Sequence, residues 1–117
     1  MYNTWIQHNG QKILYTKYSG LTEEQMIKAL KEQFEIVKAS PGKVRNFGDF
    51  TNSTVSSDFM SIAKSNGKEL SYKIEKTALI GITGIKKILL NGYNAFTKNP
   101  AHPFDTEKEA LAFLAKN

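Results

Sequence analysis

The segment TALIGI, residues 77–82, constrains the fold of this chain more than any other. It carries no charged residue, and from Ala78 on it is apolar apart from one glycine. A strand with one face in water alternates polar and apolar residues, whereas a continuously apolar strand is covered on both faces. The segment therefore predicts a strand in a central position in a sheet that has helices packed on both sides.

The first 19 residues predict a β-hairpin. Residues 4–8 and 11–19 are rich in β-branched and aromatic side chains, and Asn9-Gly10 lies between them. A type I′ turn needs positive φ at both central residues, so an Asn-Gly pair between two such segments is a strong hairpin signal.

Two further segments complete the predicted sheet. Residues 43–50 alternate apolar side chains imperfectly, which indicates a short inner strand. A short extended piece ends at Phe104 and contains Pro100 and Pro103 at or near its limits. Proline lacks the N–H group that a central strand donates, so we expect this piece at an edge of the sheet.

Residues 21–40 form the first of four predicted amphipathic helices. Thr22 followed by Gln25 fits a capping box, and the apolar residues after it recur at helical spacing. Pro41-Gly42 ends the helix, because proline cannot continue the hydrogen-bond ladder.

The second predicted helix follows a polar loop, with Ser56 or Ser57 as its N-cap. We expect it to end at Asn66-Gly67, since glycine often follows the last turn of a helix. Its predicted inward residues are Phe59, Met60, Ile62 and Ala63.

The remaining two helices lie in the second half of the chain. The third is predicted to bury one face made of Ile85, Ile88, Leu89, Gly92 and Phe96, broadened by Leu90 and Tyr93. The fourth begins with a second capping box, Thr106 and Glu109. Its predicted core residues are Ala110, Leu111, Phe113 and Leu114.

The element order ββαβαβαβα predicts one α/β domain over residues 1–117, with an N-terminal hairpin, alternating strands and helices, and a mixed sheet flanked by helices. The chain has no cysteine, which excludes disulfides, thiolate catalysis and cysteine-ligated metals. It also has no apolar run long enough to span a membrane, and its first residues, MYNTWIQHNGQK, lack the features of a secretory signal. We expect a cytoplasmic protein.

The net charge of +5 does not by itself indicate nucleic-acid binding. The lysines are scattered, Arg45 is the one arginine, and basic and aromatic residues do not interleave as they do on RNA-binding sheets. The sequence thus disfavours nucleic acid as a partner.

Four stretches together resemble the STAS domains, specifically the SpoIIAA-like group that is also called STAS and SEC14-like. They are YSGLTEEQM, VRNFGDF with the serine-rich loop after it, ALIGITGIKKILLNG and FDTEKEALAFL. The resemblance covers nearly the whole chain. It implies a small sheet flanked by helices, no enzymatic activity, no cofactor and regulation through a protein partner.

In the best understood members of that family a serine at the start of the helix after the third strand is phosphorylated. Ser57 matches that position and Ser56 is its neighbour, while the aspartate and glycine of the family motif are absent here. A phosphate on Ser57 would meet the free N–H groups of a helix start. The alternative is that one of these serines only caps the helix.

The turn between residues 81 and 87 has two readings. Thr83, Gly84, Lys86 and Lys87 would suit an anion such as a phosphate, a nucleotide or a lipid head group, because two lysines in a first helical turn oppose the helix dipole. The spacing of Gly81 and Gly84 matches neither the dinucleotide fingerprint nor the P-loop. The second interpretation is therefore that the turn is only a tight corner without a ligand.

No catalytic or metal-binding pattern is found. His8 and His102 have no metal ligands at the usual spacing, and Asp49 and Asp58 flank a loop where only an unrecognised hydrolase would use them. The leading hypothesis is a non-enzymatic regulatory module that docks a protein partner through the loop 51–58 and the helix that follows it. The alternative is a small-ligand-binding or sensing protein that uses the turn at Thr83–Lys87.

The aromatic residues of the hairpin suggest a further surface. Trp5, Tyr15 and Tyr18 cannot all share one face with Ile6 and Leu14, so we expect exposed rings on the hairpin. Edge hairpins pair readily with a second copy, and a homodimer is therefore predicted.

Overall fold

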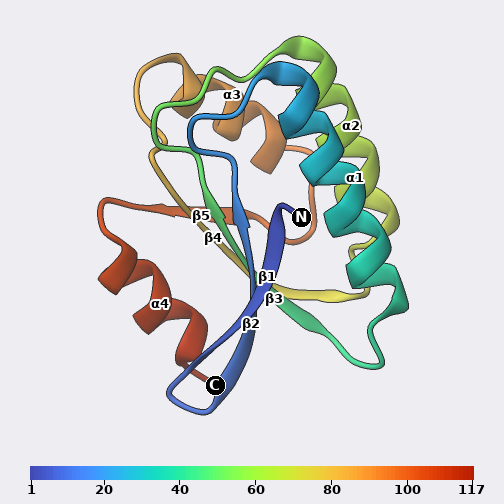
Figure 1. Ribbon diagram of the computed structural model, residues 1–117, viewed down its shortest axis with the longest axis vertical. Coiled ribbons are helices and arrows are strands. Elements are labelled where there is room, and N and C mark those ends of the chain that lie inside the picture. Colours follow the sequence, from blue (N-terminus) through green and yellow to red (C-terminus); the bar gives the residue numbers. More distant parts are fainter.

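A five-stranded mixed sheet runs through the middle of the computed structural model, which describes residues 1–117 (Figure 1). Its strands are β1 (Asn3–His8), β2 (Gln11–Lys17), β3 (Val44–Asp49), β4 (Ile74–Ile80) and β5 (Ala101–Phe104). The sheet order is β1-β2-β3-β4-β5. β1 is antiparallel to β2, and all other neighbours are parallel. The predicted hairpin, the interior strand after residue 73 and the proline-containing edge strand are confirmed.

Four helices cover the two faces of this sheet. They are α1 (Glu23–Ala39), α2 (Ser57–Glu69), α3 (Ile85–Asn94) and α4 (Glu107–Ala115). α1, α2 and α3 lie on one face, and α4 alone packs on the other (Figure 1). The predicted α/β fold is thus confirmed.

Alternate residues of β3 build the two layers. Phe47 is fully buried in a cluster with Ala110 and Leu114 of α4. Its neighbours Asn46 and Gly48 point the other way, toward the helices α2 and α3. This is the two-residue period of a strand that is covered on both sides.

Arg45 fixes the end of α4. It is 7% exposed, and its guanidinium donates hydrogen bonds to the carbonyls of Leu114 (2.5 Å) and Lys116 (2.8 Å) while pairing with Glu75 at 3.2 Å. The last carbonyls of a helix have no partner within the helix and carry partial negative charge. The buried guanidinium of Arg45 therefore supplies both hydrogen-bond donors and a positive charge to the C-terminal end of α4.

The helix boundaries agree with the sequence in part. The capping box of Thr22 and Gln25 is present. Thr106 caps α4 through the N–H of Glu109, but its hydroxyl bonds the Glu109 carboxylate in place of the predicted reciprocal bond. Ser56, not Ser57, is the N-cap of α2.

The predicted end of the second helix at Asn66-Gly67 is wrong, because α2 continues to Glu69. Gly67 is buried inside the helix, where a Cβ atom would collide with the ring and hydroxyl of Tyr93 on α3. Glycine at this position allows α2 and α3 to approach closely, and this long-range contact outweighs its local tendency to end a helix.

The predicted inward face of the third helix is also wrong in part. Leu90 is buried and Leu89 faces the interior, but Ile85, Ile88 and Phe96 are 71%, 70% and 82% exposed. Apolar residues cover more than half of the circumference of α3, so its periodicity permits more than one orientation. The contact between Tyr93 and Gly67 favours the observed orientation of α3.

The N-terminal hairpin is attached to α1 by a single carboxylate. Glu32 accepts hydrogen bonds from the backbone N–H groups of Tyr2 (2.9 Å) and Asn3 (3.0 Å) and from the side chain of Asn3 (3.1 Å). Burial opposes ionisation of Glu32, but the bonds from Asn3 and Tyr2 outweigh it, so the pKa of Glu32 lies below its ordinary value of 4.5.

We predict that Glu32→Gln lowers the free energy of unfolding at pH 7 by about 1 kcal/mol, a discounted value because water screens this partly exposed group. A lowered pKa contributes stability above the unfolded value, and this is lost as the pH falls through the folded value. The difference between the two proteins should therefore be present above the ordinary pKa of 4.5 and decrease as the pH falls through the lowered pKa of Glu32. Urea unfolding across this range measures it. Glu35→Gln on the exposed side of α1 is the control, and a pH-independent difference for Glu32→Gln would contradict the prediction.

Candidate functional site

Three loops meet at the carboxyl ends of the parallel strands. The N–H of Gly20 donates to the carbonyl of Asn52 (3.3 Å), and the N–H of Phe50 donates to the carbonyl of Ile80 (2.9 Å). These bonds join the loops after β2, β3 and β4. Ligands of open α/β sheets bind at this edge, so it is the first place to search for a site.

Gly81 brings two of these loops into contact. Its φ is +78°, and a Cβ atom at this position would lie 2.6 Å from the carbonyl carbon of Phe50, with the backbone of Thr51 also too close. Gly84 also has positive φ, at +57°, but faces open space. Gly81 therefore serves close packing of the backbone, and Gly84 serves only the bend at the N-cap of α3.

The residues of the predicted anion site are only partly free. The ammonium of Lys86 donates to the carbonyl of Phe50 at 2.8 Å, which links α3 to the end of β3. Thr83, Gly84 and Lys87 are exposed, and no side chain caps α3. An anion at this turn remains a prediction. A phosphate titration that leaves the amide resonance of Gly84 unmoved would exclude it.

Ser57 is the first residue of α2 and is exposed. The hydroxyl of its neighbour Ser56 accepts the N–H of Phe59 at 3.1 Å, so the cap is formed without Ser57. The two serines thus have separate places, a structural one for Ser56 and an accessible one for Ser57.

The two carboxylates considered for acid–base chemistry, Asp49 and Asp58, have different surroundings. Asp49 accepts bonds from the N–H of Thr51 (2.9 Å) and from the hydroxyl of Tyr15 (3.4 Å). Burial, followed by the charge of Asp49, raises the pKa of Tyr15 to about 12, so Tyr15 keeps its proton. Asp58 faces solvent in the first turn of α2. No three histidine, aspartate or glutamate side chains come together in a way that could hold a metal ion.

An apolar cavity lies between the sheet and the helices on its α1–α3 face. Its volume is about 130 Å³, and 16 of its 23 lining residues are hydrophobic. β3 and β4 contribute Asn46, Thr77 and Leu79, and α2 and α3 contribute side chains that include Ala63 and Leu89. The cavity therefore extends along the sheet, and one of its ends lies beneath the loops described above.

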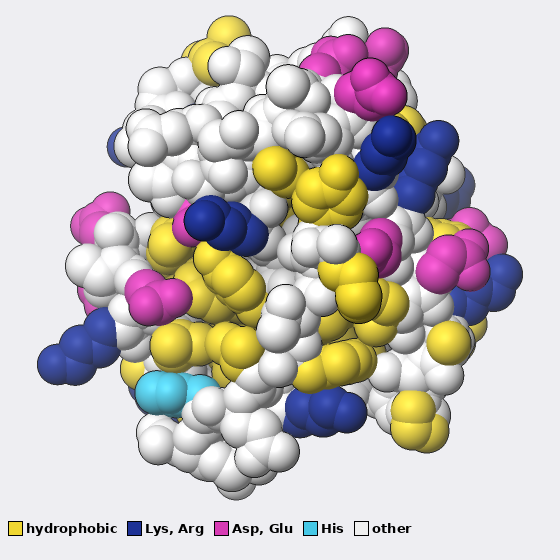
Figure 2. Space-filling model, in the orientation of Figure 1, with side chains coloured by type: hydrophobic (Ala, Val, Ile, Leu, Met, Phe, Trp, Pro, Cys, Tyr) yellow, Lys and Arg dark blue, Asp and Glu magenta, His cyan; other side chains and the backbone are white.

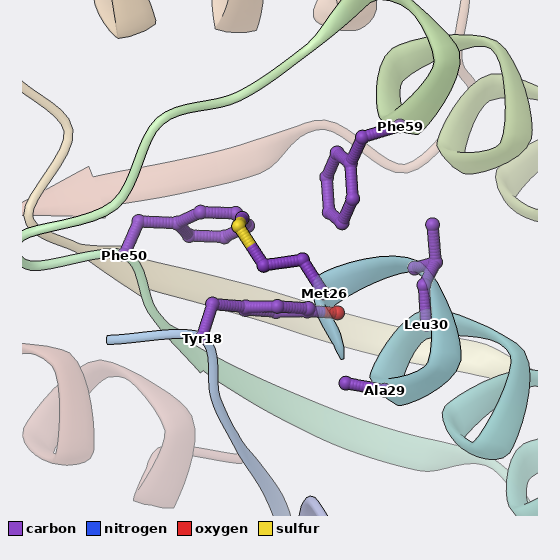
Figure 3. Packing of buried hydrophobic residues seen from close by; sticks show 6 residues of the cluster. All are labelled: Tyr18, Met26, Ala29, Leu30, Phe50 and Phe59. Carbon is purple, nitrogen blue, oxygen red and sulfur yellow. The ribbon is translucent and has the colours of Figure 1, made fainter. Parts of the chain in front are cut away.

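Three aromatic rings that pack against one another (Figure 3) contribute to the wall of the cavity. The ring of Tyr18 stacks on that of Phe50 with centroids 4.5 Å apart, and Phe59 of α2 meets both rings edge-on. Burial raises the pKa of Tyr18, so this wall carries no charge. Such a wall favours a neutral and apolar occupant.

One residue that lines the cavity carries a buried polar atom without a partner. Asn46 is 4% exposed, and its Oδ1 atom has no hydrogen-bond partner in the protein. Most buried polar groups in native proteins do have partners, and each exception calls for a physical explanation. Sequence reasoning missed this residue and the cavity, because a single asparagine in an inner strand gives no signal of what it faces.

The hairpin surface differs from the expectation of several exposed rings. Tyr18 is buried and Tyr15 packs on Phe47 with centroids 5.2 Å apart, which leaves Trp5 at 36% exposure beneath the ammonium of Lys12.

Figure 2 shows hydrophobic side chains gathered across the middle of one face, with most charged side chains nearer its edge. None of the four helices has the length and apolar character that a membrane span requires.

The architecture is that of a SpoIIAA-like α/β fold. It is similar to the crystal structure of an uncharacterized protein from the DUF3478 family with a SpoIIAA-like fold from Shewanella loihica PV-4. The TM-score is 0.74 and the identity 17%, over 96% of this chain and 91% of that one. No family model matches the sequence, and no curated protein does either. At this identity the similarity establishes the fold, and the resemblance inferred from the sequence is confirmed at that level.

We predict that Gly81→Ala lowers the free energy of unfolding by about 3 kcal/mol or more, because it adds strain at positive φ to a backbone collision. Gly84→Ala is the matched control and should cost about 1 kcal/mol, since only the strain applies there. Thermal and urea unfolding measure both values. Equal losses would show that the contact between Gly81 and Phe50 is not a tight one.

Proposed function

We propose that this protein is a non-enzymatic module that binds a small, mainly apolar ligand in the cavity beneath α2 and α3. The cavity itself is the observation that supports this most. Protein interiors are close-packed, with few voids larger than a water molecule. The space of about 130 Å³ is partly open to solvent, and its lining is mostly apolar. A ligand that fills it would bury this apolar surface and thereby stabilise the folded protein.

The position of the cavity supports the same proposal. One end of it lies at the carboxyl ends of the parallel strands, where ligands of open α/β sheets bind. The other end reaches Ile74, the first residue of β4. An engineered apolar cavity of about 150 Å³ in another protein stays dry and binds benzene. A ligand about the size of one aromatic ring therefore fits the space. This site is adjacent to the turn predicted from the sequence, since Ile82 and Lys86 also line it.

We predict that toluene binds this protein saturably and shifts the methyl resonances of Leu79 and Leu89 in NMR spectra. Ala63→Leu adds three carbon atoms at the cavity wall, so it should weaken toluene binding at least tenfold and stabilise the fold by about 1 kcal/mol. Ala112→Leu, on the exposed side of α4, is the control and should leave binding unchanged. Linear, non-saturating shifts would count against a binding cavity.

A second candidate function is a docking module for an unidentified protein partner, regulated at Ser57. The observation that favours it is the exposed Ser57 beside an independent cap at Ser56. A phosphate there would add about two negative charges at the positive end of α2, next to Asp58. Location in the cytoplasm and a homodimer through the β1 edge also remain predictions, and sedimentation at tens of micromolar tests the dimer.

We predict that Ser57→Asp stabilises the protein by about 0.3–1 kcal/mol, because a negative charge in the first turn complements the helix dipole. Ser65→Asp, exposed near the other end of α2, should destabilise it by a similar amount. Thermal unfolding at low salt measures both. Destabilisation by Ser57→Asp would show that α2 does not accommodate a phosphate. Peptide mass spectrometry of the protein from its native cells then tests whether Ser57 is modified.

A further inference from the structure

The geometry points to Asn46 as the residue that selects the ligand, and we infer that the ligand is a neutral, ring-sized apolar molecule with one hydroxyl group. This inference rests on the proposed function and names the chemical class that the cavity accepts. It is carried by the unpaired amide of Asn46, by the absence of free charge in the cavity and by the cavity volume.

Asn46 lies where a ligand would meet it. It is on the middle strand, it lines the cavity, and Thr77 of β4 faces it in register and lines the same space. Its Oδ1 atom has no partner from the protein. A carboxamide offers both an acceptor and a donor, and a hydroxyl group can donate to the first or accept from the second. One hydroxyl on the ligand would thus satisfy Asn46.

The charges around the cavity exclude an anionic ligand at Asn46. Lys86 is the single charged residue among those that line the cavity, and its ammonium already donates to Phe50. Phe50 directly follows β3 and lies four residues after Asn46, which is roughly 13 Å at 3.3 Å per extended residue. A ring-sized molecule cannot span that length. A carboxylate bound at Asn46 would be buried without a counter-charge, which is far more costly than burying a neutral hydroxyl group.

The cost of an unpaired amide supports a binding role over a packing role. A buried polar group without a hydrogen bond destabilises a protein, and an apolar side chain of similar size removes that cost. Leucine at position 46 would suit the apolar wall formed by Leu79 and Leu90. The asparagine is therefore explained by what it binds rather than by the stability of the fold.

The test compares phenol with toluene, which has the same shape but lacks the hydroxyl group. Calorimetry or NMR titration at pH 7 gives the affinity of each probe for the wild type, Asn46→Leu and Asn66→Leu. Asn66 is a matched control because it lines the same cavity but is partly exposed to water. We expect Asn46→Leu to lower the ratio of phenol affinity to toluene affinity by about tenfold. Asn66→Leu should change the ratio by no more than about twofold.

A purely structural role for Asn46 would change the melting temperature of Asn46→Leu without changing this ratio. If Asn46→Leu does not fold, the side-chain amide resonances of Asn46 in the wild type give the answer, because phenol should shift them and toluene should not.

Each other outcome is also decisive. Binding of both probes with a ratio that does not depend on residue 46 would overturn the inference and leave the proposed function standing. Tighter binding of benzoate than of phenol would overturn the neutral class. Failure of both phenol and toluene to bind the wild type would remove the proposed function and this inference with it.

Discussion

The contact between Gly81 and the backbone of Phe50 and Thr51 is the constraint on which the geometry at the carboxyl ends of the strands depends. It joins the end of β3 to the end of β4 with no side chain between them. The loops that start α2 and α3 leave from these two points, so the contact determines where both helices begin. Lys86 adds a second link from α3 to the carbonyl of Phe50. The helices are thus fixed at their first turns, close to the sheet.

Beyond their first turns, α2 and α3 do not pack directly on the sheet, and the cavity lies between them and the strands. The contact of Tyr93 with Gly67 joins α3 to α2 instead of lowering α3 onto β4. Leu90 is the one residue of α3 that is buried. The lining of the remaining space includes Ala63, whose small side chain does not fill it. The cavity is therefore a consequence of where the helices are attached and of how small the facing side chains are.

Local patterns were sufficient to predict the order of elements, because the information lies within each segment. The alternation near Asn9-Gly10, the capping box at Thr22 and the apolar run 77–82 each depend on a few neighbouring residues. The orientation of α3, the passage of α2 through Gly67 and the environment of Asn46 were not predictable in this way. Each depends on a contact between elements that are far apart in the sequence, such as Tyr93 with Gly67. The site was missed for the same reason, since a cavity has no sequence pattern of its own.

In the proposed function the ligand lies on one face of the sheet, and the other face is packed against α4. On the α4 face Arg45 and Lys76 both donate to the last carbonyls of α4, and Phe47 is fully buried against it. On the other face Asn46 and Gly48 are among the residues that line the cavity. Because successive residues of a strand point to opposite sides, a change at residue 46 alters the cavity without touching the packing of Phe47. If the proposed function holds, a substitution at residue 46 therefore changes the ligand chemistry while the packing of Phe47 against α4 stays the same.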